Sequence, residues 1–178
     1  RHILSRLERE IRQRLGAAVY GRDRDTLEAV VGRALMKRRW TVAVAESCTG
    51  GLISDRLTDV PGSSRYVVLS VVAYHNAIKQ RLLGVEPEIL AKHGAVSQQT
   101  AAAMARGVRQ RAGADVGLAI TGIAGPSGAT ATKPVGLVYL GLAIQSRTRT
   151  ARLLFHGDRR SIKEQACQAA LDWLRRSV

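Results

Sequence analysis

The segment from Thr41 to Leu57 constrains the fold of this chain more than any other stretch of the sequence. It reads TVAVAESCTGGLISDRL, so a short apolar run is followed by a polar turn with two adjacent glycines and then by an amphipathic stretch. The apolar run is typical of a buried strand, and the glycine-containing turn is typical of the junction before a helix. We therefore expect a strand, a tight turn and a helix, which is the repeating unit of α/β proteins.

The turn carries a hydroxyl and a thiol at the start of the expected helix. The first amides of a helix have no partner within it and lie at the positive end of the helix dipole. Ser47 or Cys48 could therefore act as a nucleophile whose attack creates an oxyanion beside these amides, while Gly50 and Gly51 let a ligand approach the backbone. Alternatively, Ser47 and Thr49 cap the helix and Cys48 fills a small apolar gap. The segment alone leaves both interpretations open.

Length and composition favour one globular domain. The chain has 178 residues, of which 46% are hydrophobic, enough to bury a sizeable core. The longest apolar run, residues 135–144, suits a buried strand and is shorter than the roughly 18 residues that a membrane span needs. Two distant cysteines and four histidines show no spacing that would gather a metal. We expect a soluble, reduced, cytoplasmic protein without a metal or a cofactor.

The basic charge lies mainly at the two ends of the chain. The net charge is +14, but residues 41–146 carry only 9 Lys and Arg against 6 Asp and Glu. Basic helical faces without interleaved aromatic side chains are usually solvated surface. Because the candidate residues found below all lie between residues 41 and 146, we expect the basic ends to be outside the site and any binding of nucleic acid to be weak and non-specific.

The first residues predict a helix with one apolar stripe. Hydrophobic side chains recur there at intervals of three and four: Ile3, Leu4, Leu7, Ile11 and Leu15. A lone helix of this length is marginal in water, so the stripe predicts packing against a partner subunit or another domain. We divide the chain into an N-terminal helix and linker (residues 1–24) and a domain (residues 25–178), and we expect a homo-oligomer, most simply a dimer.

Strands and helices alternate along the rest of the chain. The continuous apolar run at residues 66–74 predicts a strand that is buried on both faces. The other expected elements are a helix over 98–111 capped by Ser97, strands over 116–121 and 135–144, an edge strand over 151–155 and a helix over 162–176. This alternation predicts a three-layer α/β/α sandwich with a mixed, mostly parallel sheet.

Polar residues follow two of these strands. Tyr74, Asn76 and Lys79 come at the end of the run at 66–74, and a glycine-rich loop, residues 122–128, follows the strand at 116–121. Ligands of open α/β sheets bind outside the carboxyl ends of strands, so both groups are site candidates. A lone lysine early in a helix is, however, more often an ordinary solvated side chain. The loop lacks the GKS/T triplet and the GxGxxG pattern, which disfavours ATP and dinucleotide sites.

Taken together, the motifs resemble one family. In order, the chain contains AESCTGGLIS, LTDVPGSS, AYHNAIK, LLGV, HGAVS, TGIAGP, KPVG and FHGDR. This combination resembles the C-terminal domain of competence/damage-inducible protein A (CinA), which also occurs as a free-standing nicotinamide-nucleotide amidohydrolase. The resemblance covers residues 41–178. Residues 15–40 resemble the segment that joins this domain to a molybdopterin-binding-like domain in two-domain members, which suggests that Arg1 follows a cut in a longer protein.

The resemblance implies an amidohydrolase reaction and assigns residues to it. The carboxamide of nicotinamide mononucleotide would be hydrolysed to nicotinate mononucleotide and ammonia, with the catalytic serine, tyrosine and lysine at Ser47, Tyr74 and Lys79. A neutral serine hydroxyl is a poor nucleophile, so a lysine whose pKa is lowered by burial, or a tyrosine that relays the proton, would serve as base. The expected substrate-binding residues lie in the same motifs: Glu46, Thr49, Gly50, Gly51, Asn76, Thr121, Gly122 and Gly125.

Two functions of different class remain open at this point. The Ser, Tyr and Lys of the motifs favour an enzyme, whose substrate phosphate we expect on one of the two glycine loops. The family name and the basic ends favour a non-enzymatic accessory module for competence or DNA damage.

Overall fold

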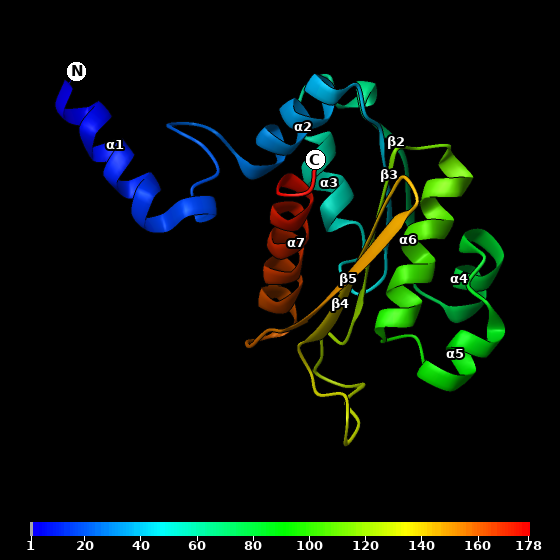
Figure 1. Cartoon of the computed structure of the whole chain (residues 1–178). Helices are drawn as coiled ribbons and strands as arrows, with labels where there is room; N and C mark the ends of the chain where they lie inside the picture. Colours follow the sequence, from blue (N-terminus) through cyan, green and yellow to red (C-terminus); the bar gives the residue numbers. More distant parts are fainter. Residues whose placement is uncertain (1) are drawn as a thin grey trace.

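A five-stranded mixed sheet forms the centre of the molecule (Figure 1). The computed structural model describes residues 2–178. The strands are β1 (Val42–Glu46), β2 (Val67–Val72), β3 (Val116–Gly122), β4 (Leu137–Ile144) and β5 (Arg147–Leu154), in the order β2-β1-β3-β4-β5. β1 is parallel to β2 and to β3, whereas β3, β4 and β5 pair antiparallel in turn. The carboxyl ends of the three parallel strands therefore meet at one end of the sheet.

Helices cover both faces of this sheet and confirm the three-layer arrangement. One face packs on α2 (Leu27–Arg38), α3 (Leu52–Thr58) and α7 (Arg159–Arg175), and the other on α4 (Asn76–Leu83), α5 (Pro87–His93) and α6 (Gln98–Ala112). Alternate residues of each strand face opposite layers, so Val44 and Leu118 join the first core while Ala43 and Ala119 join the second. The second core uses smaller strand residues, which brings α6 close to the sheet.

Local capping signals set the helix boundaries. The hydroxyl of Thr26 accepts a hydrogen bond from the amide of Ala29 at the start of α2, and the hydroxyl of Ser97 accepts one from Thr100 at the start of α6. The carboxylate of Asp158 does the same for the amide of Ser161 in α7 at 2.7 Å. The expected cap at Ser97 is confirmed, and the last helix begins three residues earlier than its apolar pattern indicated.

The position of β2 corrects the expectation of a strand buried on both faces. β2 lies at the edge of the sheet and pairs only with β1. Its residues alternate between half-buried and exposed, and the side chains of Val68, Ser70 and Val72 are exposed. An apolar run predicts a strand, but the order of strands in the sheet depends on contacts with residues far away in the chain. The other edge strand, β5, was expected as an edge but begins at Arg147, four residues before the expected start.

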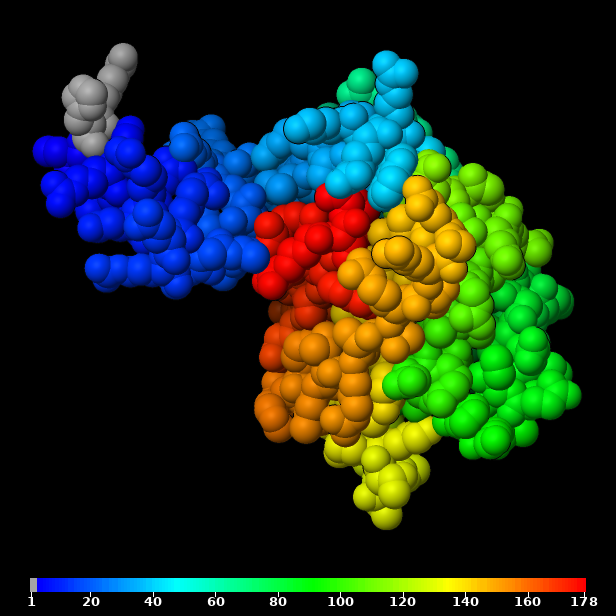
Figure 2. All heavy atoms as spheres, viewed as in Figure 1, coloured from blue at the N-terminus to red at the C-terminus, as the bar shows by residue number. Residues whose placement is uncertain are grey.

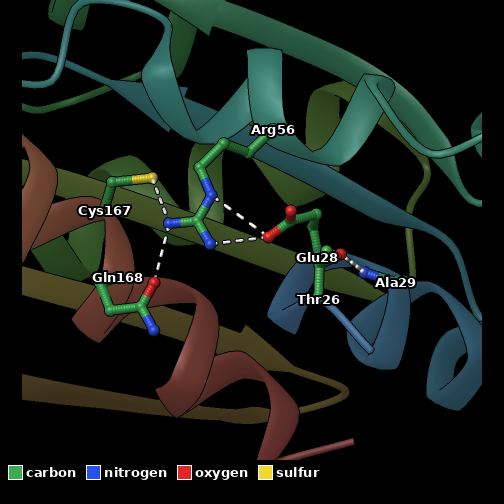
Figure 3. A network of polar contacts seen from close by, with 6 residues as sticks. All are labelled: Thr26, Glu28, Ala29, Arg56, Cys167 and Gln168. Atoms are coloured by element: carbon green, nitrogen blue, oxygen red, sulfur yellow. Dashed lines mark hydrogen bonds and ion pairs between the residues drawn. The ribbon is translucent and has the colours of Figure 1, made fainter. Parts of the chain in front are cut away.

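A polar cluster ties α2, α3 and α7 together on the first face (Figure 3). The guanidinium of Arg56 donates to the Glu28 carboxylate from Nη2 at 2.6 Å and from Nε at 3.2 Å. Its Nη1 donates to Oε1 of Gln168 at 2.9 Å and lies 3.8 Å from Sγ of Cys167. Both charged side chains are mostly buried, so each depends on the other for neutralisation.

The N-terminal helix stands apart from the domain. α1 (His2–Leu15) is followed by a short 3₁₀ turn (Gly16–Ala18), and Figure 2 shows this segment extending away from the body next to the end of α7. The stripe expected on this helix is present and its side chains are exposed. Docking of the stripe against a partner subunit or another domain therefore stays a prediction. None of the helices within residues 2–178 combines the length and the apolar character that crossing a bilayer requires.

The Arg56 cluster yields a first prediction about stability. Arg56→Met should lower the free energy of unfolding by about 3 kcal/mol, because the Glu28 carboxylate is left mostly buried without its cation. The matched control is Arg33→Met, which removes the more exposed Arg33–Asp25 pair and should cost much less, because solvent screens an exposed ion pair. Denaturant unfolding at neutral pH measures both.

The same pair predicts how stability depends on pH. Burial alone raises the pKa of Glu28, but the hydrogen bonds from Arg56 and nearby donors outweigh it, so the pKa is lowered in the folded protein. A lowered pKa means that the stabilisation is present above about pH 4.5 and is lost as the pH falls. Arg56→Met should weaken this acid dependence, and equal effects of the two Arg variants would contradict the interpretation.

Candidate active site

The candidate site is a cavity at the carboxyl ends of the three parallel strands. Ser47 follows β1, Tyr74 follows β2, and Thr121 and Gly122 end β3. These residues line a cavity of about 270 Å³ together with Lys79 and residues of the loop after β3. The three expected catalytic side chains are therefore brought to one place by the parallel half of the sheet, as expected for a site in an open α/β sheet.

Lys79 is buried beside Ser47. It lies on α4, which turns back under the end of β2, and only 1% of its surface is exposed. Its Nζ is 3.3 Å from Oγ of Ser47, 2.7 Å from the carbonyl oxygen of Ala73 and 3.0 Å from that of Tyr74. The interpretation of Lys79 as solvated surface is thus wrong, because the helix directs the side chain inward.

The surroundings of Lys79 suit a neutral amine. Burial lowers its pKa below the usual lysine value of 10.5, since the charged form loses its hydration. A neutral amine has two N–H groups and one lone pair, whereas an ammonium has three N–H groups and no lone pair. In the neutral form the two N–H groups match the carbonyls of Ala73 and Tyr74, which leaves the lone pair to accept the hydroxyl proton of Ser47. This is the arrangement of a nucleophile and its general base.

Cys48 lies beside Ser47 but has the opposite chemistry. It is buried, packing against the core on the α3 and α7 side of the sheet while also bordering the cavity. Burial raises its pKa to about 12, and the negative charge of Glu46 acts in the same direction. Because the thiolate is the reactive form, this cysteine is a poor nucleophile at neutral pH. Of the two candidates in the turn, the geometry favours Ser47.

Glu46 holds the turn that carries Ser47. Its buried carboxylate accepts hydrogen bonds from the amides of Gly51, Ile53 and Ser54 at 3.0, 3.2 and 2.9 Å, and from the hydroxyl of Ser54 at 2.5 Å. The first residue of the strand-to-helix motif thus fills the positive N-terminus of α3 with an anion of the protein itself. This corrects both early interpretations of the turn: these amides do not face a ligand, and neither Ser47 nor Thr49 caps the helix.

The expected substrate-binding residues separate into two groups. Thr121, Gly122 and Gly125 line the cavity. The hydroxyl of Thr121 donates to the carbonyl of Ala95 at 2.8 Å and so fixes the segment before α6 against the end of β3. The remaining five lie outside the cavity lining: Glu46, Thr49, Gly50, Gly51 and Asn76.

Arg159 is a cavity residue that the sequence interpretation missed. It begins α7, and its Nη1 donates to the carbonyl of Gly125 at 2.8 Å while its Nη2 donates to the phenol oxygen of Tyr74 at 2.9 Å. Tyr74 is 58% exposed, so this hydrogen bond orients a side chain at the mouth of the cavity. The expectation that the basic ends lie outside the site is wrong for this residue. Its position in the FHGDR motif was the available signal.

The described residues offer no better candidate for an active site than this cavity. A larger cavity of about 640 Å³ lies between the linker, at Ala18 and Tyr20, and α7. It lacks a paired nucleophile and base. Among the side chains of residues 3–178, His, Cys, Asp and Glu form no cluster of three that could hold a metal ion.

The fold and the site define an α/β domain with a buried Ser–Lys pair at the carboxyl ends of parallel strands. The chain belongs to the family of the CinA C-terminal domain, whose profile matches residues 24–178. A competence-damage inducible protein of Moorella thermoacetica is 54% identical over all 178 residues, which span 43% of that protein. A CinA-like protein of Dictyoglomus thermophilum is 51% identical, and the match covers 99% of this chain and 43% of the length of that protein. The chain therefore spans less than half the length of these relatives.

Solved structures of the family share the fold. The CinA superfamily protein of Klebsiella pneumoniae 700603 has a TM-score of 0.82 and 34% identity, over 85% of this chain and 94% of that one. The competence/damage-inducible protein of Agrobacterium tumefaciens has a TM-score of 0.80 and 38% identity. The match covers 86% of this chain and 96% of that one. These similarities support the mixed sheet with helices on both faces as the architecture of the domain.

The environment of Cys48 predicts its reactivity. In the native protein at pH 8, a thiol-alkylating reagent should leave Cys48 unmodified, because a pKa of about 12 leaves roughly one thiol in 10⁴ ionised. Cys167, whose pKa burial raises to about 11, should behave alike. Mass spectrometry before and after unfolding measures the labelling, and rapid modification of Cys48 in the folded protein would contradict the argument.

Proposed function

We propose that this domain hydrolyses the carboxamide of nicotinamide mononucleotide to nicotinate mononucleotide and ammonia. The observation that carries the proposal is the hydroxyl of Ser47 at 3.3 Å from the buried Nζ of Lys79. A Ser–Lys pair is suited to acyl transfer, and a carboxamide is an acyl group with ammonia as its leaving group. Membership of the CinA family supports this choice of substrate through the amidohydrolases that belong to it.

The reaction uses Lys79 twice. As a neutral amine it takes the proton of Ser47 while Oγ attacks the carboxamide carbon and forms a tetrahedral intermediate. The resulting ammonium then protonates the amide nitrogen, the C–N bond breaks and ammonia leaves. Water attacks the ester with Lys79 again as base, which releases the carboxylate and restores Ser47. The sum is one amide and one water converted to one carboxylate and one ammonium ion, that is, ammonia and the proton released by the acid.

Tyr74 assists from the mouth of the cavity. Its phenol oxygen accepts the hydrogen bond from Arg159, so its own proton can be donated toward the leaving nitrogen or relayed to Ser47. Its backbone carbonyl also holds Nζ of Lys79. The phenol of Tyr74 would thus assist proton transfer at Ser47, while the carbonyl of the same residue positions Lys79.

The oxyanion of the intermediate needs donors other than the start of α3. The amides of Gly51, Ile53 and Ser54 already bind Glu46, and a second anion there would be repelled. The amide of Gly50 already donates to the carbonyl of Ser47, so the candidate donors are the amides of Cys48 and Thr49 and those of the cavity-lining loop after β3.

A second candidate function is a competence or DNA-damage accessory module. The names of relatives such as the Moorella protein favour it, as does the net charge of +14. It gives no role to a buried Ser–Lys pair, so we rank it below the enzyme.

The proposal predicts loss of turnover in Ser47→Ala. Ammonia release from nicotinamide mononucleotide should fall by roughly 10³-fold or more, because the covalent step is removed. Cys48→Ala, the matched control one residue away, should keep most of the activity. Selective DNA binding at physiological salt by a wild-type protein that releases no ammonia would instead favour the accessory module.

The proposal also predicts a pH profile set by Lys79. Because the base must be neutral, kcat/KM should rise with pH through the pKa of Lys79, which burial moves below 10.5. Lys79→Met should cut kcat by roughly 10²-fold or more and abolish this rise. Circular dichroism checks that the variant is folded, and full activity of a folded Lys79→Met protein would refute the assignment.

A further inference from the structure

Two cationic side chains of α7 lie next to the candidate site. Arg159 and Lys163 are four residues apart on one helix, so both project from the same helical face, separated by one turn. Arg159 lines the cavity, and Lys163 reaches the turn that begins at Ser47. Neither residue was expected at the site from the sequence.

Arg159 keeps its charge without a carboxylate partner. Its two hydrogen bonds go to neutral acceptors, the carbonyl of Gly125 and the phenol of Tyr74. Within residues 2–178 the ion pairs of the protein involve other cations. The guanidinium has five N–H donors in a planar fork, so donors remain for an anion at the mouth of the cavity.

Lys163 ends over the exposed turn at Gly50. Its Nζ lies 3.4 Å from the position that a Cβ atom on Gly50 would occupy. The side chain is half-buried, and among the described residues it forms no ion pair. A glycine at this point of the turn therefore leaves space for an ammonium group that the protein itself does not neutralise.

The rest of the site leaves these cations as the place for an anion. The start of α3 is filled by the carboxylate of Glu46, so a phosphate would be repelled there. The cavity holds about 270 Å³, which is small beside the roughly 300–1,000 Å³ of pockets that enclose drug-sized ligands. With the carboxamide at Ser47, the ribose and phosphate must extend past the mouth.

We propose that Arg159 and Lys163 together bind the phosphate dianion of the mononucleotide and so select phosphorylated over unphosphorylated pyridine amides. A phosphate monoester carries close to two negative charges at neutral pH, because its second pKa is about 6. Two cations one helical turn apart can each contact its oxygens with charge-assisted hydrogen bonds. This inference rests on the proposed function and adds the residue pair that determines its specificity.

The experiment compares two substrates in two variants. Lys163→Met should raise KM for nicotinamide mononucleotide about tenfold or more, with kcat little changed. The KM for nicotinamide riboside, which lacks the phosphate, should stay the same. The matched control, Arg160→Met, lies on the same helix at an exposed position and should alter neither substrate. An unchanged KM for the mononucleotide, or an equal rise for the riboside, would overturn the proposal.

A binding measurement separates this proposal from the proposed reaction. Calorimetry with Ser47→Ala, which cannot form the acyl enzyme, measures binding of the mononucleotide without turnover. Adding Lys163→Met should weaken that binding about tenfold, and higher salt should reduce the difference. If wild type releases no ammonia but this difference is found, the reaction fails and the phosphate site stands. If wild type is active and the affinities are equal, the reaction stands and the phosphate site fails.

Discussion

The hydrogen bonds between Glu46 and the start of α3 are the constraint on which the site depends. They close the path from the last residue of β1 to the first turn of the helix, so the intervening residues have little conformational freedom. Ser47 is therefore held beside Lys79, while Cys48 packs against the core at the border of the cavity. The same bonds place a negative charge where the helix dipole is most positive, which removes that end of α3 from ligand binding. The side chain of Glu46 thus fixes the position of Ser47 and excludes the start of α3 as a binding place for a substrate anion.

Lys79 depends on the parallel pairing of β1 and β2. Because Glu46 is aligned with Val72, the residues just beyond, Ala73 and Tyr74, turn their carbonyls toward the Ser47 side of the sheet. Burying a lysine is costly, and these two carbonyls compensate part of that cost in either protonation state. The remaining cost falls on the charged form and lowers the pKa. Sheet register and base strength are therefore linked.

The sequence could predict those features that depend on neighbouring residues. The strand, turn and helix around Ser47, the cap at Ser97 and the alternation of layers follow from local patterns, and the structure confirms them. It could not predict the role of Glu46, because the resemblance named a motif without saying which member contacts the backbone. It misjudged β2 for a different reason: whether an apolar strand is central or at the edge depends on which strands pair with it. Local patterns carry no such information.

The distribution of charge along the sequence also gave a wrong prediction, namely that the basic ends of the chain lie outside the site. Residues 147–178 follow all the other site candidates in the sequence, yet the fold brings Arg159 at the start of α7 to the cavity at the carboxyl ends of β1, β2 and β3. Arg159 spans the gap between the loop after β3 and the end of β2. The other basic residues at the ends are largely exposed as well, so a net charge of +14 describes the surface, whereas the proposed phosphate site depends on where two cations of one helix are placed.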